Sequence, residues 1–277
     1  MSVVTPTPSS DGGADAPLVP KIIHQTWKDA DVPDAWKASE KSWREFAEQE
    51  GWEHKLWTDE DNRRFLQETY PWALQTYDSL RLGIQRSHLM RYFYMFHYGG
   101  VYVDMDVVPK VDRMSHLVTE VAKTYQVLLS VEAQPNGETY ISTGWMMSAA
   151  RHPFWDHTLT LLTHSKSGLW ERMWARSLRH YDVLMTTGSM FLTKSWESYK
   201  AKTHSDASVL VLPQQWLRPS SVESSEFVTL VEGGPTWRDW DSTVAGYGQA
   251  GWRNRDRVLL GVVGGLLLVI LLMAIVR

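Results

Sequence analysis

Apolar residues recur along the middle of the chain with the two spacings that distinguish helices from strands. Between positions 84 and 98 they return every three or four residues, which predicts a helix with one buried face. These apolar residues include Leu89, Tyr92, Phe93 and Phe96. The pair Gly99-Gly100 follows, and glycine adopts the left-handed turn that commonly ends helices. The strand formers Val-Tyr-Val come next, so the pattern predicts a helix, a turn and a strand in direct succession.

The two spacings alternate over residues 18–241. Period-two patterns and short apolar runs predict strands at 21–27, 52–57, 101–103, 125–131, 140–148 and 209–212. Helical spacing predicts helices at 35–50, 84–98, 154–162 and 169–181. Thr58, with Asp61 three residues later, is typical of a capping pair at the start of another helix. This alternation predicts an α/β domain with a mostly parallel central sheet flanked by helices.

The two ends of the chain differ from this central part and from each other. Residues 1–17 are rich in Pro, Ser, Gly and Asp and lack an apolar signal segment, which predicts a disordered segment. Residues 258–276 form an uninterrupted apolar run that is long enough to cross a bilayer as a helix. We therefore expect one domain at 18–241, a juxtamembrane linker at 242–257 and a C-terminal transmembrane helix at 258–276.

Composition narrows the functional classes. The chain has 277 residues, of which 43% are hydrophobic, enough for one sizeable core and short for two full domains. A formal net charge of -4 without a long basic run argues against a nucleic-acid partner. The absence of cysteine excludes a disulfide framework and thiolate chemistry.

Charged side chains gather around the helix–turn–strand unit. Asp104 and Asp106 are two residues apart, so an extended chain would point both carboxylates to the same side. Two acids on one face repel each other unless a cation lies between them, and oxygen ligands suit Mn²⁺ or Mg²⁺. Arg86 and Arg91 lie on the preceding helix, and arginine is suited to bidentate contacts with phosphate. The pattern indicates a divalent metal site at the end of a strand.

In this order, the helix, the double glycine, the aromatic strand and Asp-Met-Asp closely resemble the signature of glycosyltransferases with a Gly/DXD sugar-binding region. That family contains fungal initiating α-1,6-mannosyltransferases, catalytic subunits of inositolphosphoceramide mannosyltransferases and, more distantly, clostridial glucosylating toxins. The segment Pro-Lys-Ile-Ile-His-Gln-Thr-Trp at 20–27 also matches the family unaltered. The resemblance covers about residues 18–241 and implies a GT-A-like fold for nucleotide-diphospho-sugar transfer.

The resemblance also implies roles for individual residues. Trp27 would lie near the nucleotide base, and Gly100 would belong to the nucleotide-sugar site. Asp104 and Asp106 would form the site for Mn²⁺ or Mg²⁺. Asp106 would contact the metal directly, and Asp104 would contact the ribose and the metal's waters. Together with Arg91 they are the candidate catalytic residues. No residue is identified as a nucleophile.

One helical motif departs from the family pattern Ser/Ala-Asp-x-x-Arg-Tyr. Arg91 and Tyr92 match it, whereas His88 stands where the family has an aspartate that contacts the donor sugar. We hypothesise that the imidazole replaces that carboxylate as a hydrogen-bonding partner, and so acts in the pH range where histidine titrates. The departure also leaves open a non-catalytic, sugar-nucleotide-binding relative.

Two C-terminal motifs resemble loops of the family. In Gly-Gly-Pro-Thr-Trp at 233–237, Thr236 and Trp237 would correspond to a mobile Ser-Trp pair that closes over the metal and the diphosphate. Thr-Gly-Ser at 187–189 loosely resembles a Thr-Gly-Pro loop on the acceptor side and would form part of the crevice wall.

The implied activity is metal-dependent transfer of mannose from GDP-mannose, with retention, to a membrane-associated acceptor such as inositolphosphoceramide. A transferase that uses another sugar nucleotide on a protein-linked or polysaccharide glycan is the alternative within the same class. A third alternative is a non-catalytic scaffold tethered to the membrane, which would show no metal-dependent nucleotide binding. The resemblance further implies a regulatory membrane subunit as a partner.

The orientation of the catalytic domain stays open. Three arginines, at 253, 255 and 257, precede the apolar run, and only Arg277 follows it. The positive-inside tendency places the residue-257 side in the cytosol. The resemblance instead implies the lumen of the Golgi or of another endomembrane compartment.

Overall fold

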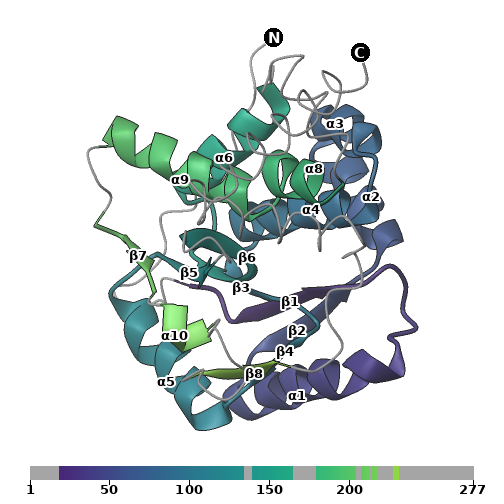
Figure 1. Cartoon of the computed structure of the whole chain (residues 1–277). Coiled ribbons are helices and arrows are strands. Elements are labelled where there is room, and N and C mark those ends of the chain that lie inside the picture. The colour runs from purple at the N-terminus through teal and green to yellow at the C-terminus, as the bar shows by residue number, and fades with distance from the viewer. Residues whose placement is uncertain are drawn as a thin grey trace, which may run out of the picture.

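A six-stranded sheet lies at the centre of the fold with helices on both faces (Figure 1). The computed structural model describes residues 19–133, 139–164, 179–203, 207–212, 214–217 and 227–230. The sheet is built from β1 (Ile22–Thr26), β2 (Glu53–Trp57), β3 (Gly100–Val103), β5 (Val127–Ala133), β6 (Thr139–Ser148) and β7 (Val209–Val211). Strands β4 (Val107–Pro109) and β8 (Val228–Leu230) form a separate antiparallel pair.

The helices follow the strands in the expected alternation. The longer ones are α1 (Asp34–Glu50), α2 (Asp59–Thr69), α4 (Gly83–His97), α5 (Val111–Glu120), α6 (Pro153–His164), α8 (Arg179–Thr186) and α9 (Ser189–Thr203). Short turns of helix are η1 (Pro71–Ala73), α3 (Leu74–Ser79), η2 (Val121–Lys123) and α10 (Gln214–Leu217). The α/β class predicted from the sequence is confirmed.

The strand order in the sheet is β2-β1-β3-β6-β5-β7. Strand β1 runs parallel to β2 and β3, and β7 runs parallel to β5. Strand β6 is antiparallel to both of its neighbours, so it alone opposes the direction of the other five strands of this sheet. Only residues 134–138 separate β5 from β6, too few for the crossover that parallel neighbours require. The sheet is therefore mostly parallel, as predicted, with one reversed strand.

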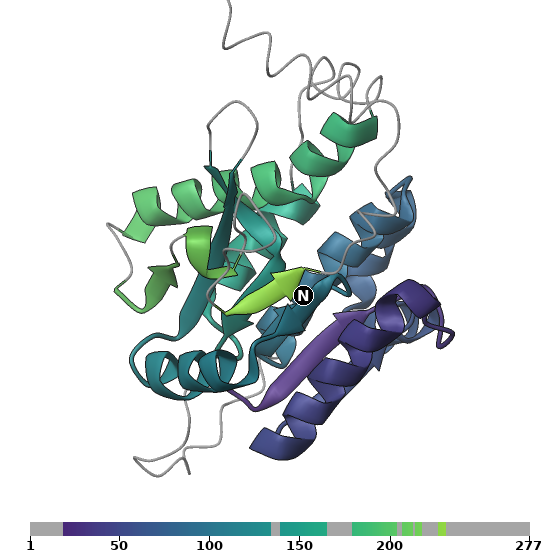
Figure 2. The same cartoon turned by 60° about the horizontal axis from the view of Figure 1, so that its bottom comes forward.

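The alternation of side chains along each strand divides the core into two parts. Tyr102 and Met146 pack with α2, α4, α6 and α9 on one face of the sheet. Val101 and Trp145 pack with α1, α5 and α10 on the other face. Figures 1 and 2 both place α1 and α5 on the face opposite α4, close to the β4–β8 pair.

Helix α4 is more buried than its sequence pattern predicts. Every residue from His88 to Met95 is buried, not only one apolar face. This helix packs on the sheet through β3 and β6 and on α6 and α8 through its other side. Polar residues of α4 are therefore drawn into the interior, and Arg91 is one of them.

The sequence signals for the start of α2 and the end of α4 are confirmed by the structure. The Thr58 hydroxyl accepts from the Asp61 amide at 3.1 Å and the Asp61 carboxylate accepts from the Thr58 amide at 3.1 Å, which completes a capping box for α2. Helix α4 ends before Gly99 and Gly100, whose φ angles are 67° and 87°. The predicted glycine stop is confirmed.

Three predictions concern segments at the chain ends that lie outside the described residues. These are the disordered segment 1–17, the linker 242–257 and the transmembrane helix 258–276. Most of the predicted helix 169–181 also lies outside them. Among the helices that the structure describes, none combines the length and the apolar character needed to cross a bilayer.

Gly100→Ala is expected to destabilise the fold more than Gly51→Ala. Both glycines have positive φ, which costs an alanine about 1 kcal/mol. At Gly51 an added methyl group meets nothing within 4 Å, whereas at Gly100 it would collide with the carbonyl oxygen of Ile22. The collision should add about 1–3 kcal/mol. Urea unfolding of both variants measures the difference, and equal losses would contradict the packing of β3 against β1.

Candidate active site

The carboxyl ends of β1 and β3 meet at a cavity of about 440 Å³. Open α/β sheets place their ligand crevices at this edge, and small-molecule sites have volumes of this order. The cavity wall includes Trp27, Arg91, Asp104 and Asp106, four of the residues predicted from the sequence. The structure thus brings together residues that are far apart in the sequence.

The two acids reach the cavity through a turn. Asp104 follows β3, and Met105 and Asp106 form a turn that leads into β4. The Val107 amide donates to the Asp104 carbonyl at 3.2 Å and closes this turn. The expectation of an extended segment was wrong, because β3 ends at Val103 and the chain bends at once toward β4. Both acids nevertheless line the same cavity.

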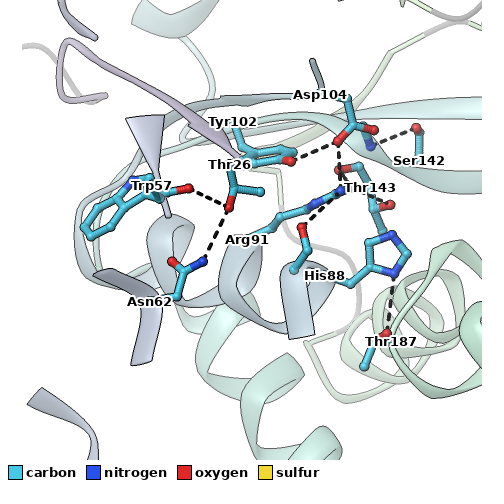
Figure 3. A network of polar contacts seen from close by, with 12 residues as sticks. Thr26, Trp57, Asn62, His88, Arg91, Tyr102, Asp104, Ser142, Thr143 and Thr187 are labelled. Carbon is cyan, nitrogen blue, oxygen red and sulfur yellow. Dashed lines mark hydrogen bonds and ion pairs between the residues drawn. The ribbon is translucent and has the colours of Figure 1, made fainter. Parts of the chain in front are cut away.

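A buried arginine fixes the first acid (Figure 3). The guanidinium of Arg91 lies 2.9 Å from the Asp104 carboxylate, and the Tyr102 hydroxyl donates to the same carboxylate oxygen at 2.9 Å. Arg91 also donates to the Thr143 carbonyl at 3.0 Å, and its guanidinium lies 4.7 Å from the centre of the Tyr102 ring. The side chain of Arg91 is only 5% exposed. Charge-assisted hydrogen bonds of this kind fix the orientation of the Asp104 carboxylate.

The donor set fits a hard divalent cation. Asp104 and Asp106 supply carboxylate oxygens, the ligands that Mn²⁺ and Mg²⁺ prefer. Within the ranges that the structure covers, no group of three or more His, Cys, Asp or Glu side chains could hold a metal ion. Two protein carboxylates suit a metal that shares its coordination shell with substrate phosphates, as Mg²⁺ commonly does.

Trp27 provides an aromatic surface beside the acids. It follows β1, its backbone amide donates to the Trp57 carbonyl at 3.0 Å, and it packs against the cluster of Val32, Trp36 and Met105. Met105 lies between the two acids in the sequence, so this cluster joins Trp27 to the acid turn. The position is compatible with the predicted contact to a nucleotide base, which stays a prediction.

Three other predicted site residues on α4 do not line the cavity. Arg86 donates to the Leu80 carbonyl at 2.9 Å. His88 lies 3.4 Å from the Thr187 hydroxyl, and the Tyr92 hydroxyl donates to the Thr187 carbonyl at 2.5 Å. The burial of α4 on both sides explains this placement, since His88 and Tyr92 point toward the segment after α8. The motif at 187–189 therefore packs behind the cavity wall.

The remaining predicted residues are placed as follows. Gly100 lies at the start of β3, against Ile22, and shapes the backbone without lining the cavity. Thr236 and Trp237 lie outside the described residues, as does the whole motif 233–237. Their roles in closing the site stay predictions.

Sequence reasoning missed further residues of the cavity wall, including Asp59, Ser87 and Tyr102. Asp59 was assigned no role, although only Thr58 separates it from the end of β2. Because β2 is parallel to β1, its carboxyl end opens at the same sheet edge, and this rule could have identified Asp59. Ser87 lies one turn before Arg91 on α4, which places both side chains on one face.

Acid should weaken the fold through buried histidines. Burial lowers the pKa of His24 to about 3, and burial reinforced by the charge of Arg91 holds the pKa of His88 well below its ordinary value. Below about pH 6.5 the unfolded chain therefore binds protons that the folded chain does not, and the free energy of unfolding falls with falling pH. Each such histidine contributes about 1.4 kcal/mol per pH unit until its folded pKa is reached.

The test compares urea unfolding at pH 6.5 and pH 5.0. His88→Asn should reduce the loss of stability by about 2 kcal/mol over this interval. His116→Asn, the same substitution at an exposed position, is the matched control. An unchanged pH dependence in His88→Asn would refute the assignment. The depressed pKa also argues against the hypothesis that His88 changes charge near neutral pH.

Comparison with known proteins identifies the family to which the chain belongs. Residues 33–122 match the family profile described as glycosyltransferase sugar-binding region containing DXD motif. The family resemblance inferred from the sequence is confirmed. The matched region contains α4, the double glycine and both acids of the cavity wall.

Individual relatives extend the match. The chain is 29% identical over 254 residues to "Inositol phosphoceramide mannosyltransferase 2" of Schizosaccharomyces pombe, covering 90% of this chain and 65% of that protein. It is 34% identical over 196 residues to "Mannosyl phosphorylinositol ceramide synthase SUR1" of Saccharomyces cerevisiae, covering 69% of this chain and 46% of that protein. The chain thus spans about half to two thirds of the length of these relatives.

A solved structure titled "PaToxG Glycosyltransferase" has a TM-score of 0.43 at 13% identity, covering 67% of this chain and 72% of that chain. This similarity is too distant to support a conclusion about the site.

Proposed function

We propose that this protein is a metal-dependent glycosyltransferase of GT-A-like fold that transfers mannose from GDP-mannose, with retention, to inositolphosphoceramide or a similar membrane-associated acceptor. The observation that carries the proposal is the convergence of Trp27, Arg91, Asp104 and Asp106 on one cavity at the carboxyl ends of β1 and β3. The names of the two relatives support the choice of sugar and acceptor.

Each residue has a definite task in this proposal. Asp104 and Asp106 hold Mn²⁺ or Mg²⁺, which when bound neutralises charge on the departing nucleoside diphosphate. Arg91 keeps the Asp104 carboxylate oriented through the 2.9 Å ion pair. The Tyr102 hydroxyl adds a second fixed contact to Asp104, which limits its rotation. Trp27 supports the nucleotide base.

The C-terminal part of the chain completes the proposal. Residues 258–276 anchor the enzyme in the Golgi or another endomembrane, where a lipid acceptor is confined to the bilayer surface. Thr236 and Trp237 close over the bound donor, and a regulatory membrane subunit binds the enzyme. The side of the membrane that carries the catalytic domain is decided by protease access to a C-terminal tag.

The test uses the full chain in detergent micelles with a panel of nucleotide sugars. GDP-mannose should be consumed in the presence of Mn²⁺, and chelation should abolish the reaction. Added inositolphosphoceramide should become mannosylated. Preference for another nucleotide sugar and for a glycan acceptor would replace this proposal with the alternative transferase. Metal-dependent nucleotide binding without turnover would indicate a non-catalytic relative.

A further inference from the structure

A third carboxylate lies in the cavity wall apart from the acid turn. Asp59 is the first residue of α2 and directly follows Trp57-Thr58 at the end of β2. Within the described ranges, its side chain makes no hydrogen bond and no ion pair to another residue. It is partly buried, so it is a hydrogen-bond acceptor that is partly withdrawn from water and faces the cavity.

We propose that Asp59 recognises the guanine base of the donor nucleotide, accepting hydrogen bonds from N1–H and from the exocyclic 2-amino group. This inference rests on the proposed function, and it assigns the nucleotide specificity to one side chain. It requires that Asp59 lies at the end of the cavity that would hold the nucleotide base, away from the two acids that would hold the metal.

The sheet provides this separation. Strand β1 pairs with β2 on one side and with β3 on the other. Asp59 follows β2 and Asp104 follows β3, so the two carboxylates emerge on opposite sides of β1. Strands two positions apart in a sheet are about 10 Å apart. This is comparable to the span of a nucleoside from the pairing edge of its base to its first phosphate.

Backbone contacts place Asp59 beside the aromatic surface. The Asp59 amide donates to the Lys28 carbonyl at 3.2 Å, and the Trp27 amide donates to the Trp57 carbonyl at 3.0 Å. The segments that follow β1 and β2 therefore run side by side, with Trp27 and Asp59 both in the cavity wall. A planar base can stack on an aromatic ring and donate hydrogen bonds to a carboxylate. Trp27 and Asp59 provide these two groups in the cavity wall.

The surrounding charges leave the carboxylate available. Burial raises the pKa of Asp59, and the charge of Arg86 opposes that effect. Arg86 makes no ion pair with Asp59, since its guanidinium donates to the Leu80 carbonyl and lies over the Tyr77 ring. The ammonium of Lys28 pairs with Asp29 at 3.5 Å. The Asp59 carboxylate is therefore not paired with either of these cations and can accept hydrogen bonds from a ligand.

The chemistry of the bases selects guanine. An ionised carboxylate carries two acceptor oxygens and no donor. Guanine presents N1–H and the 2-amino group side by side, so both carboxylate oxygens find a donor. Adenine presents an acceptor at N1, and uracil presents a single N–H between two carbonyls. A site built to pair with a donor group strongly disfavours a ligand that lacks it.

The experiment measures nucleotide affinity of the full chain in detergent with Mn²⁺, by titration calorimetry. The ligands are GDP, inosine diphosphate, which lacks the 2-amino group, and xanthosine diphosphate, which has a carbonyl there. The wild-type chain should bind GDP at least about tenfold more tightly than inosine diphosphate. Asp59→Asn should lower GDP affinity about 10- to 100-fold and remove this preference.

The same substitution should create a new preference. An asparagine amide offers one acceptor and one donor, which match N1–H and the 2-carbonyl of xanthine. Asp59→Asn should therefore bind xanthosine diphosphate more tightly than GDP, a gain that damage to the fold would not produce. Glu60→Gln removes the same charge from the exposed next residue of α2 and should leave all three affinities unchanged.

The outcomes separate this inference from the proposed function. A wild-type chain that binds none of the three nucleotides overturns both. A wild-type chain that binds GDP and inosine diphosphate equally overturns the role of Asp59 alone. Asp59→Asn that keeps the wild-type ratio between GDP and inosine diphosphate overturns the role of Asp59 alone. If Asp59→Asn does not fold, Asp59→Ser must lose the same ratio, and retention of the ratio in that variant overturns the inference.

Discussion

Asp106→Asn should reduce Mn²⁺-dependent sugar transfer by at least about a hundredfold while the fold is retained. The substitution keeps the size of the side chain and removes the charge that a hard cation requires. Metal neutralisation of a leaving group contributes several kcal/mol, and each 1.36 kcal/mol corresponds to a factor of ten in rate. Initial rates over a Mn²⁺ titration, with circular dichroism as the check on folding, measure the effect.

A matched control isolates the metal contribution. Asp112→Asn makes the same chemical change at an exposed position in the first turn of α5 and should leave the rate unaltered. Asp104→Asn should be comparably damaging, with a larger effect on nucleotide affinity if this acid meets the ribose. An Asp106→Asn enzyme with wild-type turnover would remove the basis for the metal assignment.

Arg91→Met should lower both stability and activity. Methionine fills much of the same space but leaves the partly buried Asp104 carboxylate without its 2.9 Å ion pair. Breaking a fully buried pair costs about 3–5 kcal/mol, and the 20% exposure of the Asp104 side chain places the expected loss below that range. Thermal unfolding and the Mn²⁺ concentration for half-maximal rate report the two effects, and the required Mn²⁺ concentration should rise because Asp104 is no longer held in place.

The double variant Arg91→Met with Asp104→Asn tests the cause. Once Asp104 is neutral, loss of Arg91 leaves no unpaired charge, so the double variant should be more stable than the sum of the single losses predicts. Additive losses would mean that Arg91 acts through its contacts with Thr143 and the Tyr102 ring instead. Arg91→Lys should fall between wild type and Arg91→Met, since lysine keeps the charge but not the planar geometry.

Sequence patterns predicted the parts of the fold whose stabilisation is local. Helix α1, the capping box at Thr58 and the glycine stop after α4 each depend on residues a few positions apart. Four residues of the cavity wall could also be predicted, because they lie at strand ends or on the helix beside them. Their common placement follows from the parallel arrangement of β1 and β3.

Other features depend on distant contacts that leave little local signal. Strands β4 and β8 have three residues each and pair across more than a hundred positions, with Val107 opposite Leu230. Helix α9 mixes serine, threonine and lysine with apolar residues and lacks a clear apolar stripe. His88 was assigned to the donor sugar, whereas tertiary packing directs it toward Thr187. The course of the chain after Val103 likewise depends on the pairing of β4 with β8.

The position of β1 between β2 and β3 has a consequence for how such a protein could diversify. The residues that follow β2 and those that follow β3 belong to separate segments of the chain. Both strands pair with β1, but they do not pair with each other. A few substitutions after β2 could therefore exchange one nucleotide for another while the acid turn and its arginine stay intact. Grafting 58–62 between relatives that use different donors would show whether the two halves of the crevice evolve independently.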